Sequence, residues 1–233
     1  MSNSDEGAVA VVIGASGGVG SALLERLRAD SRYPTVLGFS RSSDPSLDLT
    51  DEASIEAAAE LARSRGELQL VIDATGFLHD DHYTPEKSWR QLEPDHLARA
   101  FALNASGPAL LMKHFLPLLS RSERSVFATL SARVGSIGDN RLGGWHSYRA
   151  SKAALNMLVR GLSIELKRRN PKGVCVALHP GTVDTRLSQP FSKQGLNVRS
   201  PDTAAEELLA VIDRLDEDDN GCFYDYRGEP VAW

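Results

Sequence analysis

Residues 8–20 constrain the fold more than any other part of the chain. Residues 8–13, Ala-Val-Ala-Val-Val-Ile, are apolar and largely β-branched, which predicts a strand buried on both faces, as in a parallel sheet covered by helices. This strand leads directly into the glycine-rich turn of residues 14–20, and a helical pattern follows the turn. Because glycines let the backbone approach a pyrophosphate, whose charge the helix N-terminus then meets, this order predicts a nucleotide site.

The glycines of the turn, Gly14, Gly18 and Gly20, form a GxxxGxG spacing, which differs from the GxGxxG of the commonest dinucleotide-binding fold. A tight turn that binds nothing is the alternative interpretation. If a dinucleotide binds, we expect the turn to contact it through Gly14, Ser16, Gly18, Val19 and Gly20.

Apolar runs alternate with helical patterns along the rest of the chain. Strands are expected over residues 35–39, 68–72, 126–130, 173–178 and 222–224, and the main helices over residues 52–65, 95–119, 147–169 and 201–215. This alternation predicts an α/β fold, a Rossmann-type doubly wound parallel sheet with helices on both faces and right-handed crossovers. The length suffices for a single domain over residues 1–233, of which residues 1–7 are expected to be disordered.

The composition argues against several classes of partner. A formal net charge of -5 disfavours nucleic acid and anionic membrane as general partners. The chain has only two cysteines, Cys175 and Cys222, no apolar run near the ~20 residues that cross a bilayer, and no signal-peptide core at its start. We therefore expect a cytoplasmic protein in a reducing compartment, without a nucleic-acid or membrane partner.

The end of the strand over residues 35–39 indicates which nicotinamide dinucleotide the chain prefers. An acidic residue here would accept hydrogen bonds from a ribose 2′-hydroxyl and favour NAD. The chain instead reads Ser-Arg-Ser-Ser over residues 40–43, and the guanidinium of Arg41 with its neighbouring hydroxyls suits a 2′-phosphate. The pattern predicts NADP(H) as the cofactor, with a solvated loop arginine as the alternative.

Two further residues near strand ends are candidates for nucleotide contacts. Asp48 is positioned to contact the adenine or merely to hold the turn before the next helix, for which Thr50 or Asp51 is the expected N-cap. Gly76 closes the segment that ends the strand over residues 68–72, where a glycine fits a backbone passing close to a bound nucleotide.

Two segments read as irregular. Residues 77–94 are polar and aromatic and are expected to form a surface excursion. His79 and His82, with the aspartates between them, suggest a metal site, but no helical, ligand-rich context surrounds them and we expect no metal. Residues 186–200 have the composition of a flexible loop and are expected to close over a substrate.

Tyr148 and Lys152 stand four residues apart at the start of a long helical pattern, so they project from one helical face. Free tyrosine, with a pKa of ~10, is a poor acid or base at neutral pH. An ammonium beside it would lower the pKa of Tyr148 and bring its proton into a useful range. The pair is therefore suited to general acid–base catalysis, and two unrelated surface residues are the alternative.

Polar residues at two other places extend this candidate site. Asn104 lies just before the helix break predicted at residues 107–108, where freed carbonyls would let it hold a water or a backbone group. The strand over residues 126–130 runs into Ser131 and, further on, Ser136. Hydroxyls at the carboxyl end of a central strand lie where ligands bind in open α/β sheets.

Together these signals resemble the short-chain dehydrogenase/reductase family over essentially the whole chain. The resemblance rests on Gly14, Gly18, Gly20, Asn104, Tyr148, Lys152, Ala153, Ala154, Pro180, Gly181 and Thr185. More narrowly, residues 135–152 and the terminal Trp233 resemble the branch of that family with the C-factor and sniffer-like carbonyl reductases. The family commonly packs through the helices over residues 95–119 and 147–169, which implies a homodimer or homotetramer.

The resemblance implies hydride transfer between NADP(H) and a small carbonyl or alcohol substrate, with Tyr148 exchanging the proton on oxygen. It also implies that Lys152 binds the nicotinamide ribose and lowers the pKa of Tyr148, and that Asn104 holds a water in a relay to Lys152. Val183 and Thr185 would hold the carboxamide end. Beyond the glycine turn, the cofactor contacts expected are Arg41, Asp48, Gly76, Tyr148, Lys152, Pro180, Gly181, Val183 and Thr185.

The chain departs from the family pattern at two places. Residues 73–76 read Asp-Ala-Thr-Gly where the family usually carries an Asn-Asn-Ala-Gly type of motif. Ala132 stands where the catalytic serine usually stands, so we expect Ser131 to orient the carbonyl, with Ser136 or no serine at all as alternatives. The leading interpretation is an NADPH-dependent carbonyl reductase. The alternative that these departures favour is an NADP(H)-binding signalling or regulatory protein with little or no turnover.

Overall fold

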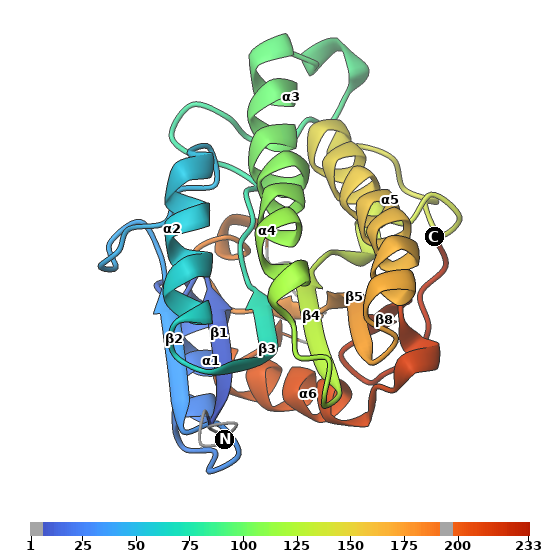
Figure 1. Ribbon diagram of the computed structural model, residues 1–233. Coiled ribbons are helices and arrows are strands. Elements are labelled where there is room, and N and C mark those ends of the chain that lie inside the picture. Colours follow the sequence, from blue (N-terminus) through green and yellow to red (C-terminus); the bar gives the residue numbers. More distant parts are fainter. Residues whose placement is uncertain (1–6, 192–197) are drawn as a thin grey trace, which may run out of the picture.

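The computed structural model describes residues 7–191 and 198–233. Its centre is a six-stranded parallel sheet in the order β2-β1-β3-β4-β5-β8 (Figure 1). The strands are β1 (Ala8–Ile13), β2 (Thr35–Phe39), β3 (Glu67–Asp73), β4 (Ser125–Leu130), β5 (Gly173–His179) and β8 (Phe223–Asp225). Every predicted strand is present, with β8 at the sheet edge. The expected disorder of residues 1–7 concerns residues that, apart from Gly7, lie outside the described ranges.

Helices cover both faces of the sheet (Figure 1). The α-helices are α1 (Gly18–Arg28), α2 (Glu52–Arg63), α3 (Pro94–Phe101), α4 (Gly107–Phe115), α5 (His146–Arg169) and α6 (Pro201–Arg214). Helices α2, α4 and α5 share one core with the sheet, which includes Phe115, Phe127 and Leu155, while α1 and α6 share the other, which includes Leu23 and Leu208. Burying one such side chain contributes about 1.5–3 kcal/mol, so the two cores fix the strand ends in place. The predicted doubly wound α/β fold is confirmed.

Side-chain caps set where several helices begin. Asp51 caps α2, and its Oδ1 accepts a hydrogen bond of 3.1 Å from the N–H of Ala53. Ser200 caps α6 in the same way through the N–H of Thr203, at 3.0 Å. A capping side chain of this kind contributes about 1 kcal/mol. Of the two residues predicted to cap α2, the structure selects Asp51.

The helix predicted over residues 95–119, with a break at residues 107–108, is divided in the structure as expected, but the division lies at residues 102–106. Helix α3 begins earlier than expected, with Glu93 in the N-cap position, and a π-helix, η2 (Ala102–Ser106), separates it from α4. The π-helical hydrogen bond from the N–H of Gly107 to the carbonyl of Ala102 widens the turn. The predicted break lies at η2 because Pro108, in the first turn of α4, lacks the N–H that a continuous α-helix would use.

Residues 77–94 are more than the surface excursion that the sequence predicted. Phe77, Leu78 and Glu86 are each less than 8% exposed. The segment contains the short 3-10 helix η1 (Trp89–Gln91), but Phe77 contacts His96 of α3 and Glu86 contacts Ser147 of α5. The prediction failed because the composition of an irregular segment does not show which of its residues are buried.

The predicted substrate loop over residues 186–200 lies between the small strand β6 (Thr182–Val183) and α6. It contains the 3-10 helix η5 (Gln189–Phe191) and the strand β7 (Val198–Arg199), which pairs with β6. Residues 192–197 of this loop lie outside the described ranges.

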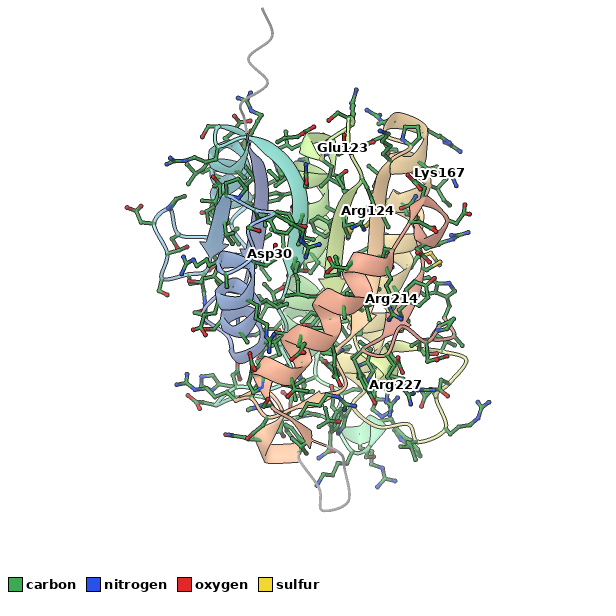
Figure 2. The ribbon with its side chains drawn as sticks, turned by 90° about the horizontal axis from the view of Figure 1, so that it is seen from below. Asp30, Glu123, Arg124, Lys167, Arg214 and Arg227 are labelled. Carbon is green, nitrogen blue, oxygen red and sulfur yellow. The ribbon has the colours of Figure 1, made fainter. Side chains whose placement is uncertain are left out.

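Helix α6 crosses the sheet beside α1, on the face that Figure 2 presents. Arg26 of α1 forms a bidentate ion pair with Asp202, at 2.8 Å, at the start of α6. At the other end of α6, Arg124 donates hydrogen bonds of 3.0 Å to the carbonyls of Ile212 and Leu215 (Figure 2). Both ends of α6 are therefore anchored. Within the described residues no helix is long and apolar enough to span a bilayer.

Candidate active site

The chain order of the sheet reverses beside β1, which lies between β2 and β3. Ligands of open α/β sheets bind at the carboxyl ends of strands at such a switch point. The turn after β1 packs here against the segment after β3, because a Cβ on Gly14 would lie 3.0 Å from the backbone of Ala74. Gly14 has φ +82°, a left-handed conformation that suits glycine. Ser16 is exposed on the same turn, and Val19 is half-buried beside it.

Two further glycines of the turn permit close packing. A Cβ on Gly20 would lie 2.2 Å from the carbonyl oxygen of Gly14, and a Cβ on Gly18 would lie 2.8 Å from the Cγ2 of Thr185. The second contact brings the turn beside the segment that follows β5. Gly17 occupies the N-cap position of α1 and has no side chain that could cap the helix. The N–H groups of the first turn are thus oriented to meet an anion.

Arg41 lies in the exposed loop after β2, one strand away from the glycine turn. In the same region Asp48 accepts hydrogen bonds from the hydroxyl and the N–H of Thr50, at 2.7 and 2.8 Å. These bonds, with a smaller contribution from the charge of Arg41, hold the pKa of Asp48 below its usual range. Asp48 therefore holds the turn, as one of its two interpretations predicted, and its contact with an adenine stays a prediction.

Asp73, the last residue of β3, is where the chain departs from the usual family motif. Asp73 is 1% exposed. One carboxyl oxygen accepts hydrogen bonds from the hydroxyl and the N–H of Thr75, at 2.6 and 3.0 Å, and the other accepts one from the hydroxyl of Thr129 on β4, at 2.7 Å. The carboxylate thus joins the ends of β3 and β4 and shapes the turn that leads to Gly76.

Lys152 reaches the same strand ends from α5. It is 2% exposed, and its Nζ donates a hydrogen bond of 2.7 Å to the carbonyl of Leu130. A Cβ on Gly76 would lie 3.9 Å from this Nζ, and a Cβ on Gly135 would lie 2.7 Å from the Cβ of Lys152. Burial lowers the pKa of Lys152 to about 8, against the opposing charge of Asp73. The ammonium is therefore still largely protonated at neutral pH.

Tyr148 lies one helical turn before Lys152 on α5 and is partly buried. Burial raises the pKa of Tyr148 to about 12. The lowering of this pKa that the sequence predicted is not found, because Lys152 directs its Nζ to Leu130 and burial dominates. The phenol is therefore neutral at physiological pH, the state in which it can give up a proton.

Asn104 lies in the π-helix and is fully buried. Its Oδ1 accepts a hydrogen bond from the N–H of Phe77, and its Nδ2 donates to the carbonyl of Phe77, both at 2.7 Å. Nδ2 also donates to the Oγ of Ser151 on α5, at 3.0 Å. Of the two partners predicted for Asn104, the structure shows the backbone group. A water relay to Lys152 stays a prediction.

The serines after β4 are engaged with other groups. The hydroxyl of Ser131 donates to the Oδ1 of Asn156 on α5, at 2.6 Å. Ser136 accepts a hydrogen bond from the N–H of Asp139, at 3.1 Å, and is 1% exposed. Since the single hydroxyl proton of Ser131 is used, orienting a substrate carbonyl would require it to leave Asn156. The role of Ser131 stays a prediction.

Pro180 and Gly181 follow β5 and turn the chain toward the glycine-rich turn. Gly181 has φ +76°. The carbonyl of Val183 accepts a hydrogen bond from the hydroxyl of Ser188, and the same oxygen of Ser188 accepts one of 3.2 Å from the N–H of Thr185. The residues predicted to hold the carboxamide end of a cofactor thus form one hydrogen-bonded segment.

An aromatic wall beside Tyr148 was missed by the sequence reasoning. It consists of Trp145, Phe191 and His79. The Trp145 ring meets Phe191 edge-on with centroids 5.3 Å apart, and Phe191 meets His79 in the same way, also at 5.3 Å. The Trp145 ring also meets the Tyr148 ring at 6.3 Å. The three segments lie far apart in the sequence, so no local pattern could have brought them together.

A parallel sheet with a glycine turn at its switch point and a buried lysine one turn after a tyrosine defines a class of dinucleotide-fold proteins. Residues 36–207 match a family model described as enoyl-(acyl carrier protein) reductase. The chain is also 33% identical, over 82% of its length and 80% of the relative, to 1-hydroxy-2-glutathionyl-2-methyl-3-butene dehydrogenase of Rhodococcus sp.. The chain belongs to the short-chain dehydrogenase/reductase family.

Other relatives fall in the branch that the sequence resembled. C-signal of Myxococcus xanthus is 40% identical over 138 residues, which cover 59% of this chain and 78% of that protein. Among solved structures, the NADPH-bound carbonyl reductase from chicken fatty liver superposes with a TM-score of 0.83 at 28% identity, covering 98% of this chain and 99% of that chain. The carbonyl reductase Sniffer of D. melanogaster has the same TM-score and coverage at 23% identity, which shows the shared fold.

Proposed function

We propose that this protein is an NADPH-dependent oxidoreductase that acts on a small carbonyl or alcohol substrate. The observation that carries the proposal is the buried Nζ of Lys152, bonded to Leu130 at the carboxyl end of a central strand, with Tyr148 one helical turn away. Burying a cation lowers the stability of the fold, and buried charged groups of this kind are concentrated at functional sites. Membership in the short-chain dehydrogenase/reductase family supports the same reaction class.

The residues around the switch point fit NADP(H). The uncapped start of α1 and the close packing at Gly14 and Gly20 suit a pyrophosphate. Exposed Arg41 suits a 2′-phosphate, and the related chicken carbonyl reductase is described as NADPH-bound. The carboxamide end would be held by Val183 and Thr185. When bound, the nicotinamide supplies the hydride.

The residues of the chain would transfer the proton and orient the substrate. Tyr148, neutral because its pKa is about 12, gives its proton to the substrate oxygen as the hydride arrives. The ammonium of Lys152 stabilises the phenolate that results and binds ribose hydroxyls. The water that returns a proton by way of Lys152 would bind Asn104 as a donor, because both amide hydrogens of Asn104 are donated to Phe77 and Ser151. Ser131 is the serine proposed to orient the carbonyl, by exchanging its bond to Asn156 for one to the substrate.

The direct test is oxidation of NADPH by the purified protein, followed by absorbance, across aldehydes, ketones and quinones. We expect turnover with NADPH that exceeds turnover with NADH. Absence of turnover with every carbonyl, together with absence of NADP⁺ reduction by the matching alcohols, would refute the proposal.

A second function is supported by a specific observation. Ala132 stands at the usual place of the catalytic serine, and Ser131 beside it is bonded to Asn156. Such a site would bind NADP(H) with little turnover and act as a signalling or regulatory protein. C-signal, the Myxococcus relative, bears a name of that kind. Tight NADPH binding in calorimetry without hydride transfer would favour this alternative.

We also propose a homodimer or homotetramer. Of the apolar residues on the two long helices, Met112 and Leu155 are fully buried in the core, whereas Met157 on α5 is 71% exposed and Ile164 is 45% exposed. An exposed apolar strip on a central helix is suited to a second copy. Light scattering after size-exclusion chromatography gives the mass, and a monomer at micromolar concentration would refute the assembly.

A further inference from the structure

Trp145 has a strained backbone directly before the helix that carries Tyr148. It has φ 50° and ψ 42°, and among the described residues it is the only non-glycine residue with a positive φ. Gly143 and Gly144 before it have φ +61° and +67°. Glycine adopts this left-handed region freely, but tryptophan does so only when its surroundings force it. A residue held in this way beside an acid–base group indicates a constraint that serves the site.

Glu86 supplies that constraint through two different groups. Its backbone carbonyl accepts a hydrogen bond of 2.5 Å from the N–H of Trp145. Its side-chain carboxylate accepts bonds from the N–H of Ser147, at 3.2 and 3.3 Å, and from the Ser147 hydroxyl. One residue of the segment before α3 therefore fixes both sides of the turn into α5.

The carboxylate of Glu86 is itself held in place. It is 2% exposed, and the Nδ1 of His96 on α3 lies 3.2 Å from its Oε1. The His96 ring is stacked on Tyr83 at a centroid distance of 4.8 Å, and Phe77 meets it edge-on at 6.2 Å. Burial works to raise the pKa of Glu86, but the hydrogen bonds from Ser147 and from the backbone of Glu86 itself, with the nearby charge of His96, together outweigh burial and the pKa is lowered. The group is thus a carboxylate at neutral pH.

We propose that Glu86 is a positioning residue for Tyr148, acting through Trp145 and Ser147. The carboxylate fixes the first turn of α5, in which Tyr148 follows Ser147 directly. The carbonyl fixes Trp145 in its left-handed conformation, so that its ring stands edge-on to both Tyr148 and Phe191. Removing the carboxylate would free the turn, and a displacement of the phenol by about 1 Å costs about 100-fold in rate. The kinetic part of this inference rests on the proposed function.

The test combines kinetics with a signal that does not need turnover. Glu86→Ala is expected to lower kcat at least ~10-fold while the dissociation constant of NADPH stays within about two-fold. Glu86→Gln, which keeps an accepting oxygen, should restore most of kcat. Ser147→Ala removes one hydrogen bond only and should lower kcat about three-fold, so it keeps the test decisive if Glu86→Ala does not fold. The matched control is Glu93→Ala, because Glu93 is exposed and makes no side-chain cap.

The second readout is ¹⁹F NMR of protein labelled with 5-fluorotryptophan. The chain has three tryptophans, so Trp145→Phe assigns the relevant signal by its loss. In Glu86→Ala the backbone carbonyl that holds Trp145 remains, but its segment loses the anchor that the carboxylate makes to Ser147, so the Trp145 signal should shift or broaden. In Glu93→Ala the signal should stay in place. An unchanged Trp145 signal, or a kcat for Glu86→Ala and Ser147→Ala equal to that of Glu93→Ala, would overturn the proposal. A wild-type protein without turnover would refute the proposed function alone, because the ¹⁹F signal would still decide the role of Glu86.

Discussion

The Nζ of Lys152 lies 2.7 Å from the carbonyl oxygen of Leu130 and donates a hydrogen bond to it. This bond ties α5 to the carboxyl end of β4 and places an ammonium group among strand ends. The same lysine is 2% exposed, and burial lowers its pKa to about 8. The buried ammonium of Lys152 therefore lowers the stability of the fold at neutral pH. Proteins tolerate such a loss of stability at functional sites, which supports a role of the charge in the reaction.

That cost predicts a pH-dependent stability difference. Below pH 8 the ammonium is protonated in both folded and unfolded chains, whereas between about 8 and 10.5 the folded chain releases a proton that the unfolded chain retains. Relative to Lys152→Met, the wild type should therefore gain about 2–3 kcal/mol of unfolding free energy between pH 7 and 10. Urea unfolding at each pH measures the difference. Lys167→Met, at an exposed site on the same helix, should differ from the wild type by the same unfolding free energy at every pH. If the difference for Lys152→Met is also independent of pH, the prediction is wrong.

Replacing Tyr148 by phenylalanine should remove turnover and spare binding. The substitution deletes the proton donor and keeps the ring that packs beside Trp145. We expect kcat/KM to fall about 10³-fold, since general acid–base catalysis contributes about 10²–10⁴-fold. Steady-state NADPH oxidation measures the loss, and fluorescence titration checks that NADPH still binds. Tyr33→Phe, on the opposite side of the sheet, serves as the control; equal rates for the two variants would exclude Tyr148 as the acid.

Removal of the Arg41 side chain should weaken the binding of NADPH much more than the binding of NADH. One or two charge-assisted hydrogen bonds to a 2′-phosphate are worth about 1.5–3 kcal/mol, so Arg41→Ala should weaken NADPH binding about 10- to 100-fold. NADH binding should change less than about three-fold, because NADH lacks the phosphate. Calorimetric titration with both dinucleotides gives the ratio, with exposed Arg65→Ala as the control. Equal losses for both dinucleotides would show that Arg41 does not contact the phosphate.

The question of the serine can be decided by two exchanges. Ala132→Ser adds a hydroxyl donor where the family usually carries one, and we expect kcat/KM to rise about 10-fold. Ser131→Ala removes the hydroxyl proposed to orient the carbonyl and should lower kcat about 100-fold. It also leaves Asn156 without its donor, which should lower the unfolding free energy by about 1–2 kcal/mol. A loss of stability at unchanged kcat would show that Ser131 does not orient the carbonyl.

The order of strands and helices could be predicted because each element leaves its own local pattern in the sequence. The runs now forming β1, β4 and β5 are continuous and apolar, as expected of strands buried on both faces, and all three are. The glycine turn was recognisable for a similar reason, since its residues are consecutive. These features depend on local sequence alone.

The parts of the site that escaped prediction depend on contacts across the chain. Asp73 was recognised as a departure, but its bond to Thr129 arises only because β3 and β4 are neighbours. Glu86 carried no signal at all, since a glutamate in a polar segment is usually solvated. The pKa of Tyr148 was predicted in the wrong direction because spacing along a helix gives direction but not burial.

The π-helix between α3 and α4 makes the length of the chain here a determinant of the site. The hydrogen bond from the N–H of Gly107 to the carbonyl of Ala102 closes a turn that holds one residue more than an α-turn, so a deletion within residues 102–106 that restored regular winding would remove the wide turn that carries Asn104. Asn104 would then lose its hydrogen bonds to Phe77. The position of Asn104 therefore depends on the number of residues in this segment as well as on their identity. A single-residue deletion here should reduce activity as much as the loss of the Asn104 side chain.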